Sequence, residues 1–263
     1  MEASEAQLKA QQPSDKRSLQ RFGELYRPAL ARALSLPSSF DLGAEFTGEE
    51  IPGLLFKPDG RVRLQPSRVA LVVSDNPEKR PGALEKRLLD LGWTVLAIDC
   101  FGIGEHKAPE GAPERDLDAG FFDTYNRTDT AERVHDVLAA VDYLGSLGKV
   151  SVVGQGMAGL WCLLAAPFAR GVEAVVVDAC GLDLASDQAL LDELYMPCLR
   201  RAGDLRSAMS LSTGARLLIH NTQGKFGTSW AESAFGAAGR RDALMLREAE
   251  ARAVKIAAWV CEG

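Results

Sequence analysis

The spacing of apolar residues differs between the two ends of this chain. The first sixteen residues are polar, and we expect them to fray. From Leu19 to Ala33, apolar side chains recur every three or four residues, which predicts one amphipathic helix. Pro28 favours a bend in that helix, and residues 37–39 are expected to end it. The N-terminal part is therefore predicted to be a helical arm.

Farther along, short apolar strands alternate with helices. Residues 51–58 form an extended segment whose prolines favour the edge of a sheet. Further strands are expected at residues 69–73, 94–98, 150–153, 172–177, 216–220 and 243–246. Helices are expected at residues 83–91, 128–147 and 157–168, over about thirty residues before the strand at 216, near Trp230, and up to Trp259. This alternation predicts the α/β class: a mostly parallel, doubly wound sheet with helices on both faces. We divide the chain into an N-terminal polar segment and helical arm, residues 1–40, and one domain, residues 41–263.

Composition excludes several classes of protein. The chain has 263 residues, of which 46% are hydrophobic and 25% charged, and its net charge is −6. An acidic chain is a poor match for nucleic acid, which is bound by basic surfaces. The longest apolar stretch, residues 157–169, contains Pro167 and is shorter than the roughly 20 residues of a membrane span. The first seven residues lack the basic start and apolar core of a signal peptide, so we expect a cytoplasmic protein and no membrane partner.

The thiols and imidazoles are scattered along the sequence. Five cysteines without a C-x-x-C pair predict reduced, mostly buried thiols. Three separated histidines and isolated cysteines do not predict a metal site.

The sequence from Gly154 to Gly159 has two interpretations. It matches G-x-G-x-x-G between a strand and a helix, and Asp178 follows Gly159 by 19 residues, as in a dinucleotide-binding fold. It also matches a G-x-S-x-G nucleophile elbow in which Gly156 replaces serine. A dinucleotide fingerprint normally opens its domain, whereas two strand–helix units precede this one. Position in the chain favours the elbow, and we expect no nicotinamide cofactor.

Other segments carry a resemblance to a known family. The loop from Asp99 to Glu105 resembles the D-x-x-G-x-G-[ES] loop of α/β-hydrolases. Residues 51–58 resemble the lead strand of the acetyl-xylan-esterase and prolyl-oligopeptidase-like branch, and residues 122–126 and 133–137 resemble the segment before its elbow. The resemblance covers about residues 45–260 and implies an α/β-hydrolase fold.

The resemblance also implies positions for a Ser-His-Asp triad, and the sequence departs from all three. Glycine stands at the nucleophile position, 156. Residues 221–226 follow the strand that normally precedes the acid and contain no carboxylate. Residues 247–251 follow the last strand without a histidine. Asp75 also lies where oxyanion donors are expected and would repel an oxyanion. The triad is predicted to be degenerate.

Six residues are candidates for lining a cleft at the carboxyl edge of the sheet: Gln155, Gly156, Met157, His106, Asp178 and His220. Each of the two histidines also has an interpretation without a functional role. His106 could lie on an exposed loop, and His220 could be partly buried with its hydrogen bonds made within the protein. Asp178 is expected to cap the amides of residues 179–181. His135 is expected on a solvated flank, and Cys180 lacks a base that would make it a nucleophile.

Two classes of function remain open. The first is a non-catalytic module, a ligand-binding or scaffold protein, with a small molecule held in that cleft. The second is an enzyme, either a carboxylic-ester hydrolase with a non-standard site or, less favoured, an NAD-type oxidoreductase. Fold alone does not choose between them, because function resides in the site.

Overall fold

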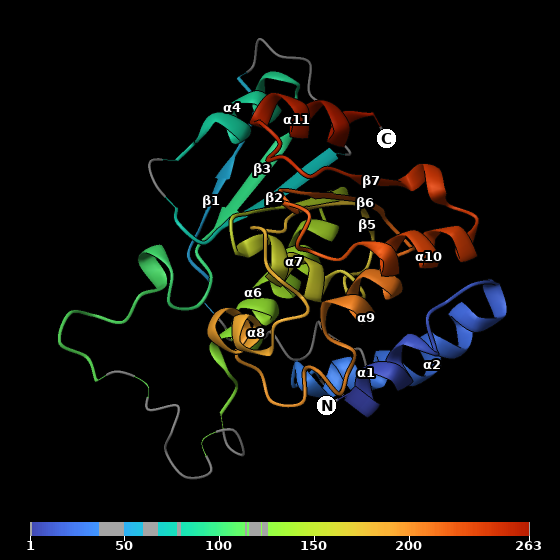
Figure 1. The fold of residues 1–263 in the computed structure, drawn as a ribbon. Coiled ribbons are helices and arrows are strands. Elements are labelled where there is room, and N and C mark those ends of the chain that lie inside the picture. The colour runs from blue at the N-terminus through green and yellow to red at the C-terminus, as the bar shows by residue number, and fades with distance from the viewer. Residues whose placement is uncertain are drawn as a thin grey trace.

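In the part of the chain that the structure describes, the sheet has seven strands and is parallel except at one edge (Figure 1). The computed structural model describes residues 2–36, 50–59, 68–77, 80–113, 115, 122 and 126–262. The strands are β1 (Gly53–Phe56), β2 (Arg68–Ser74), β3 (Thr94–Ile98), β4 (Lys149–Gln155), β5 (Val172–Asp178), β6 (Arg216–His220) and β7 (Leu244–Leu246). Their order is β1-β3-β2-β4-β5-β6-β7, and β1 alone among them pairs antiparallel, with β3. The predicted α/β class and the edge position of the first strand are confirmed.

Helices cover both faces of the sheet and bury two apolar cores. On one face lie α6 (Asp129–Gly145), α7 (Ala158–Ala165), α9 (Asp204–Leu211) and α10 (Ser229–Ala238). On the other face α4 (Ala83–Asp90) packs with α11 (Ala253–Cys261), and Figure 1 shows these two helices side by side. The strands between them are apolar on both sides because neither face meets solvent.

The N-terminal segment is more ordered than the sequence predicts. Residues 2–9 form a helix, α1 (Glu2–Lys9), and Leu8 is buried, so the expectation of a frayed start was wrong. Asp15 caps α2 (Lys16–Ala33) by accepting a hydrogen bond from the amide of Ser18. The apolar face of α2, with Phe22 and Leu30 buried, packs against α9 and α10. Burial of this face explains why the helix continues through Pro28. The helix end expected at residues 37–39 was wrong: α2 ends at Ala33, since Ser35 has positive φ, which a right-handed helix does not allow. The domain boundary after residue 40 lies outside the described residues.

The connection between β5 and β6 also differs from the prediction. Instead of one helical stretch it contains α8 (Asp187–Leu194), an irregular segment at residues 195–203, and α9. Gly203 and Asp204 both have positive φ, which a continuous right-handed helix does not allow. The chain therefore turns sharply between α8 and α9.

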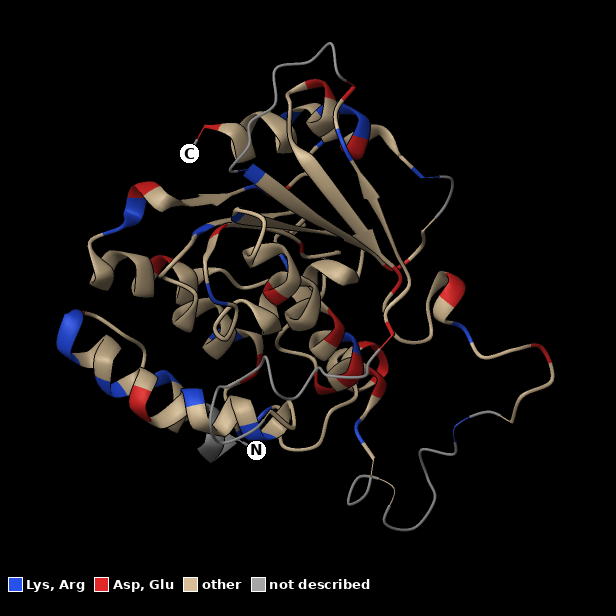
Figure 2. Cartoon of the chain, turned by 180° about the vertical axis from the view of Figure 1, so that it is seen from behind, with Lys and Arg blue, Asp and Glu red and all other residues tan. Residues whose placement is uncertain are grey.

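Charge is distributed unequally between the two ends of the strands (Figure 2). At the amino ends, Arg68 and Arg216 donate hydrogen bonds to carbonyl oxygens at the end of α11. At the carboxyl ends lie Asp75, Asp99 and Asp178. Among the described residues, the helices are all too short or too polar to cross a bilayer.

Candidate functional site

A tight turn joins the central strand β4 to α7. Gly156 has φ +61°, a left-handed conformation that glycine adopts without strain, and its carbonyl oxygen accepts a hydrogen bond from the Gly159 amide at 2.9 Å. β4 lies between β2 and β5, fourth in the sheet, with two parallel strands before it in the chain. This is the position of a hydrolase elbow and not of the first strand of a dinucleotide fold. The predicted turn is confirmed.

Each glycine of the G-x-G-x-x-G match is required by contacts within the protein. A Cβ atom at Gly154 would lie 2.5 Å from the Gly159 Cα, and one at Gly159 would overlap the backbone of Asp178. A Cβ at Gly156 would lie 2.5 Å from Oδ2 of Asp75. Gly154 and Gly159 let α7 pack closely on β4 and β5, whereas Gly156 leaves space for a carboxylate.

Asp75 occupies the space in front of the turn. It follows β2, and its Oδ2 accepts a hydrogen bond from the backbone amide of Met157 at 2.7 Å. In a G-x-S-x-G elbow, the amide after the nucleophile is one donor of the oxyanion hole. The sequence predicts that Asp75 lies near this hole as a repulsive charge. The structure places its carboxylate on the donor itself.

Asp178 is a structural residue at the end of β5. Its Oδ1 accepts hydrogen bonds from the Cys180 amide at 2.9 Å and from Nδ2 of Asn221 at 2.8 Å, so the predicted capping role is confirmed. Burial, together with the neighbouring Asp178 carboxylate, raises the pKa of the Cys180 thiol to about 12. At neutral pH Cys180 is therefore protonated and a poor nucleophile, in agreement with the sequence. The five cysteines are free, but two of them, Cys100 and Cys162, are fully buried, which is fewer than predicted.

The three histidines lie in different surroundings. His220 ends β6 opposite Asp178; it is buried, and its Nδ1 accepts a hydrogen bond from the Ala251 amide at 3.3 Å. Burial lowers the pKa of His220, so its ring is neutral at pH 7. His106 lies partly exposed in a short 3-10 helix, η1 (Gly104–His106), with its ring edge-on to Phe101.

The prediction for His135 was wrong. This residue is 1% exposed, and its Nε2 lies 2.9 Å from the carbonyl oxygen of Leu34. The C-terminal end of α2 packs over this part of α6. His135 is therefore buried, although the spacing of apolar residues in α6 predicts a solvent-exposed position for it.

The loop after β3 is held by its own motif residues. Asp99 accepts a hydrogen bond from the Glu105 amide at 2.9 Å and forms an ion pair with Arg80 at 2.9 Å. Gly104 has φ +53°, and a Cβ there would overlap the Asp99 carboxylate. The D-x-x-G-x-G-E sequence therefore specifies a loop conformation. Residues 123–125 of the segment before the elbow lie outside the described residues.

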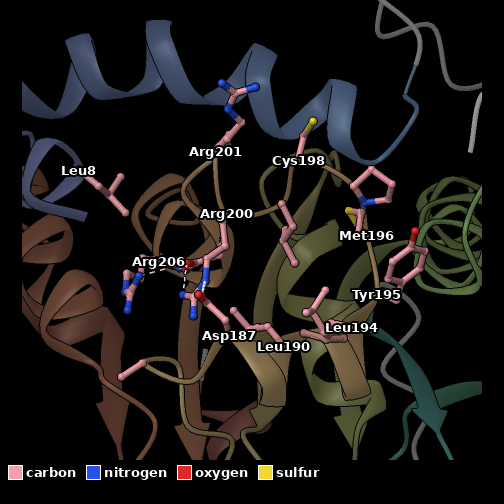
Figure 3. Close-up of a pocket in the computed structure, with 15 residues that line it drawn as sticks. Leu8, Asp187, Leu190, Leu194, Tyr195, Met196, Cys198, Arg200, Arg201 and Arg206 are labelled. Carbon is pink, nitrogen blue, oxygen red and sulfur yellow. Dashed lines mark hydrogen bonds and ion pairs between the residues drawn. The ribbon is translucent and has the colours of Figure 1, made fainter. Parts of the chain in front are cut away.

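Of the cavities formed by the described residues, one lies beside the loop after β2 and another beside α8. Gln155 lines a polar cavity of about 280 Å³ together with Ser74, Asn76 and Arg80. A cavity of about 580 Å³ lies beside α8, in the connection between β5 and β6 (Figure 3). The cavity beside α8 is not predictable from the sequence, because the leucines of α8 have the spacing of ordinary core residues. Within the described parts of the chain, no three His, Cys, Asp or Glu side chains converge as metal ligands.

Comparison with known proteins supports the fold. No family model matches the chain, and no curated protein matches it. A Bacteroides fragilis protein assigned as an acetyl xylan esterase superposes with a TM-score of 0.60 at 9% identity, covering 92% of this chain and 80% of that one. TT1662 from Thermus thermophilus gives 0.53 at 13% identity, covering 80% and 90%. Est1E from Butyrivibrio proteoclasticus, with ferulic acid bound, gives 0.50 at 13% identity, covering 81% and 93%. The chain has an α/β-hydrolase fold.

Proposed function

We propose that this protein is a non-catalytic α/β-hydrolase-fold module that binds a small-molecule ligand and does not transfer acyl groups. The observation that carries the proposal is the position of Asp75. Its carboxylate takes the Met157 amide and fills the space that a nucleophile side chain at position 156 would need.

Acyl transfer by a serine hydrolase needs a nucleophile, a base and an oxyanion hole. Gly156 supplies no hydroxyl, and a negative charge on the Met157 amide opposes the oxyanion of a tetrahedral intermediate. Asn221 follows β6, where the resemblance implies an acid, and its amide is hydrogen bonded to Asp178. Arg247 follows β7, and no histidine lies beyond position 220. Each catalytic requirement is thus opposed by a particular residue.

The same carboxylate disfavours the oxidoreductase alternative. A dinucleotide pyrophosphate binds where the glycine-rich turn meets the helix N-terminus. Asp75 already holds an amide there, and its negative charge would repel the phosphates. The free thiols support the cytoplasmic location that we assign to the protein, since reduced cysteines persist in a reducing compartment.

The test is hydrolysis of p-nitrophenyl acetate by the wild type, Gly156→Ser and the double variant Asp75→Ala/Gly156→Ser. We expect rates indistinguishable from buffer and from heat-denatured protein, because the new hydroxyl has no base beside it. Gly145→Ser is the matched control for an added hydroxyl, since a Cβ at Gly145 would meet open space.

Two results would contradict the proposal. One is turnover by the wild type above that of denatured protein, which would favour an ester hydrolase with a non-standard site. The other is a gain of a hundredfold or more in Gly156→Ser that disappears when His106 or His220 is replaced, because it would reveal a hidden base.

A further inference from the structure

A further cavity lies between the C-terminal end of α2 and the N-terminal end of α6. Parts of three segments that are far apart in the sequence line it: residues 29–35, 126–131 and 197–202. Its volume is about 350 Å³, which is within the usual range for small-molecule sites. We call it the α2–α6 cavity. Its lining includes neither Asp75 nor Gly156, so it is separate from the elbow.

Two arginines are the charged side chains of the α2–α6 cavity. Arg32 belongs to the last turn of α2, and Arg201 belongs to the irregular segment before α9. Figure 3 shows the Arg201 side chain extending toward α2, away from Leu190 and Leu194. Both arginines are exposed, and within the described parts of the chain neither guanidinium has a hydrogen-bond or ion-pair partner. Of the described residues that line the cavity, none is acidic, so two positive charges there are not neutralised.

The nearby carboxylates of α6 are engaged with other arginines. Asp129 and Glu132 lie in the first turn of this helix. Asp129 forms an ion pair with Arg115 at 2.6 Å, and Glu132 forms one with Arg127 at 3.4 Å. The chain as a whole has a net charge of −6, so two unpaired arginines beside one cavity differ from the rest of the molecule. Their combined field attracts an anion.

The uncharged groups of the α2–α6 cavity also favour an anion. Thr128 lines the cavity and caps the 17-residue helix α6, so the positive end of the helix dipole borders it. The Thr128 Oγ1 accepts a hydrogen bond from the Ala131 amide at 3.3 Å, which leaves the hydroxyl proton available to a ligand. At the end of α2, the carbonyl oxygen of Arg32 already accepts a hydrogen bond from the Ser35 amide at 3.0 Å. Donors therefore outnumber free acceptors around the cavity.

We propose that the α2–α6 cavity binds a small molecule through a phosphate group that contacts both Arg32 and Arg201. A phosphate monoester carries close to two negative charges at neutral pH, which matches two guanidinium groups, and each guanidinium can donate two hydrogen bonds to it. A carboxylate has one negative charge and leaves one arginine without a partner. The cavity is larger than a phosphate group, so the rest of the ligand lies against Ala29, Pro197 and Ala202. The inference rests on the proposed function, because it names the ligand class of a binding module.

The experiment is isothermal titration calorimetry of the full chain with phenyl phosphate, inorganic phosphate and benzoate, at pH 8 and one fixed ionic strength. We expect phenyl phosphate to bind at one site, about fivefold more tightly than benzoate, as one additional exposed ion pair allows. The two phosphate compounds distinguish the sources of the group. Tighter binding of phenyl phosphate assigns the site to an organic phosphate, whereas equal affinities assign it to free phosphate, and both results support a phosphate site.

Three variants that each remove one exposed arginine test the location. Arg32→Gln and Arg201→Gln should each weaken phenyl phosphate binding by about fivefold. Arg21→Gln is the matched control: Arg21 is exposed on α2 but does not line the cavity, so its replacement should change the affinity less than twofold. Arg201 also lines the cavity beside α8 and one beside α1, whereas Arg32 lines neither of these, so the effect of Arg32→Gln identifies the cavity. The urea unfolding midpoint should confirm that all three variants fold.

Three outcomes would overturn the inference. One is failure of the folded wild type to bind either phosphate compound, and another is a benzoate affinity equal to or above that of phenyl phosphate. The third is an effect of either Arg32→Gln or Arg201→Gln that is no larger than that of Arg21→Gln. Absent phosphate binding with no ester turnover refutes this inference alone, whereas ester turnover refutes the proposed function whether or not phosphate binds.

Discussion

The elbow and the cavity beside α8 differ in how they are filled. At the elbow, glycines let backbone and carboxylate atoms approach so closely that no added carbon fits at positions 154, 156 and 159. Beside α8, apolar side chains leave about 580 Å³ empty. The first region is the elbow turn of this fold, and the second contains free volume.

The two regions also differ in charge. The carboxyl edge of the sheet presents Asp75, Asp99 and Asp178, and one of the three, Asp99, is paired with an arginine. In the cavity beside α8, Arg200 and Arg206 are paired with Asp187 and Asp204. Unpaired negative charge therefore distinguishes the elbow from the cavity, and mutation of Asp75 tests this comparison.

The largest expected change in the free energy of unfolding distinguishes the closely packed elbow from the open cavity beside α8. Gly159→Ala should lower the free energy of unfolding by about 3 kcal/mol, because its Cβ meets the rigid backbone of Asp178. Leu191→Ala should change it by less than about 0.5 kcal/mol, since that side chain is 52% exposed. Urea unfolding of both variants measures the difference. Equal effects would show that the two regions are equally packed.

A smaller effect tests whether Asp75 and the turn act as a unit. Gly156→Ala should cost about 2 kcal/mol, from positive φ and from overlap with the Asp75 carboxylate. Asp75→Ala removes the overlap, so the double variant should be more stable than the sum of the single effects by about 1 kcal/mol. A double-mutant cycle from urea unfolding gives this coupling. Strict additivity would contradict the arrangement at the turn.

The smallest effect concerns pH. Burial lowers the pKa of His220 from 6.5, so the unfolded chain binds the proton more tightly than the folded one. The contribution of the neutral ring to stability is complete above pH 6.5 and is lost as pH falls below it, with a slope of at most about 1.4 kcal/mol per pH unit. His220→Gln should remove this part of the slope between pH 7 and pH 5. Unfolding curves of both proteins across that range provide the measurement, and identical slopes would mean that His220 titrates normally.

Predictions from the sequence are most reliable at positions whose backbone conformation suits only one residue type. Gly156 predicted its turn because other residues are strained at positive φ. They are least reliable where a distant element changes the surroundings of a residue. His135 is buried because the end of α2, a hundred residues away in sequence, covers it.

The sequence by itself determined the α/β alternation and the turn at Gly156. It also determined that position 156 is not a serine and that no histidine follows position 220. These properties can be read from the sequence because periodicity and residue identity are local. Only the tertiary structure decided that Asp75 fills the turn and that the leucines of α8 line a cavity. Both depend on which side chains meet across elements far apart in the chain. The spacing of Leu190 and Leu194 is the same in a packed core and in a pocket wall, and the difference lies in what is packed opposite.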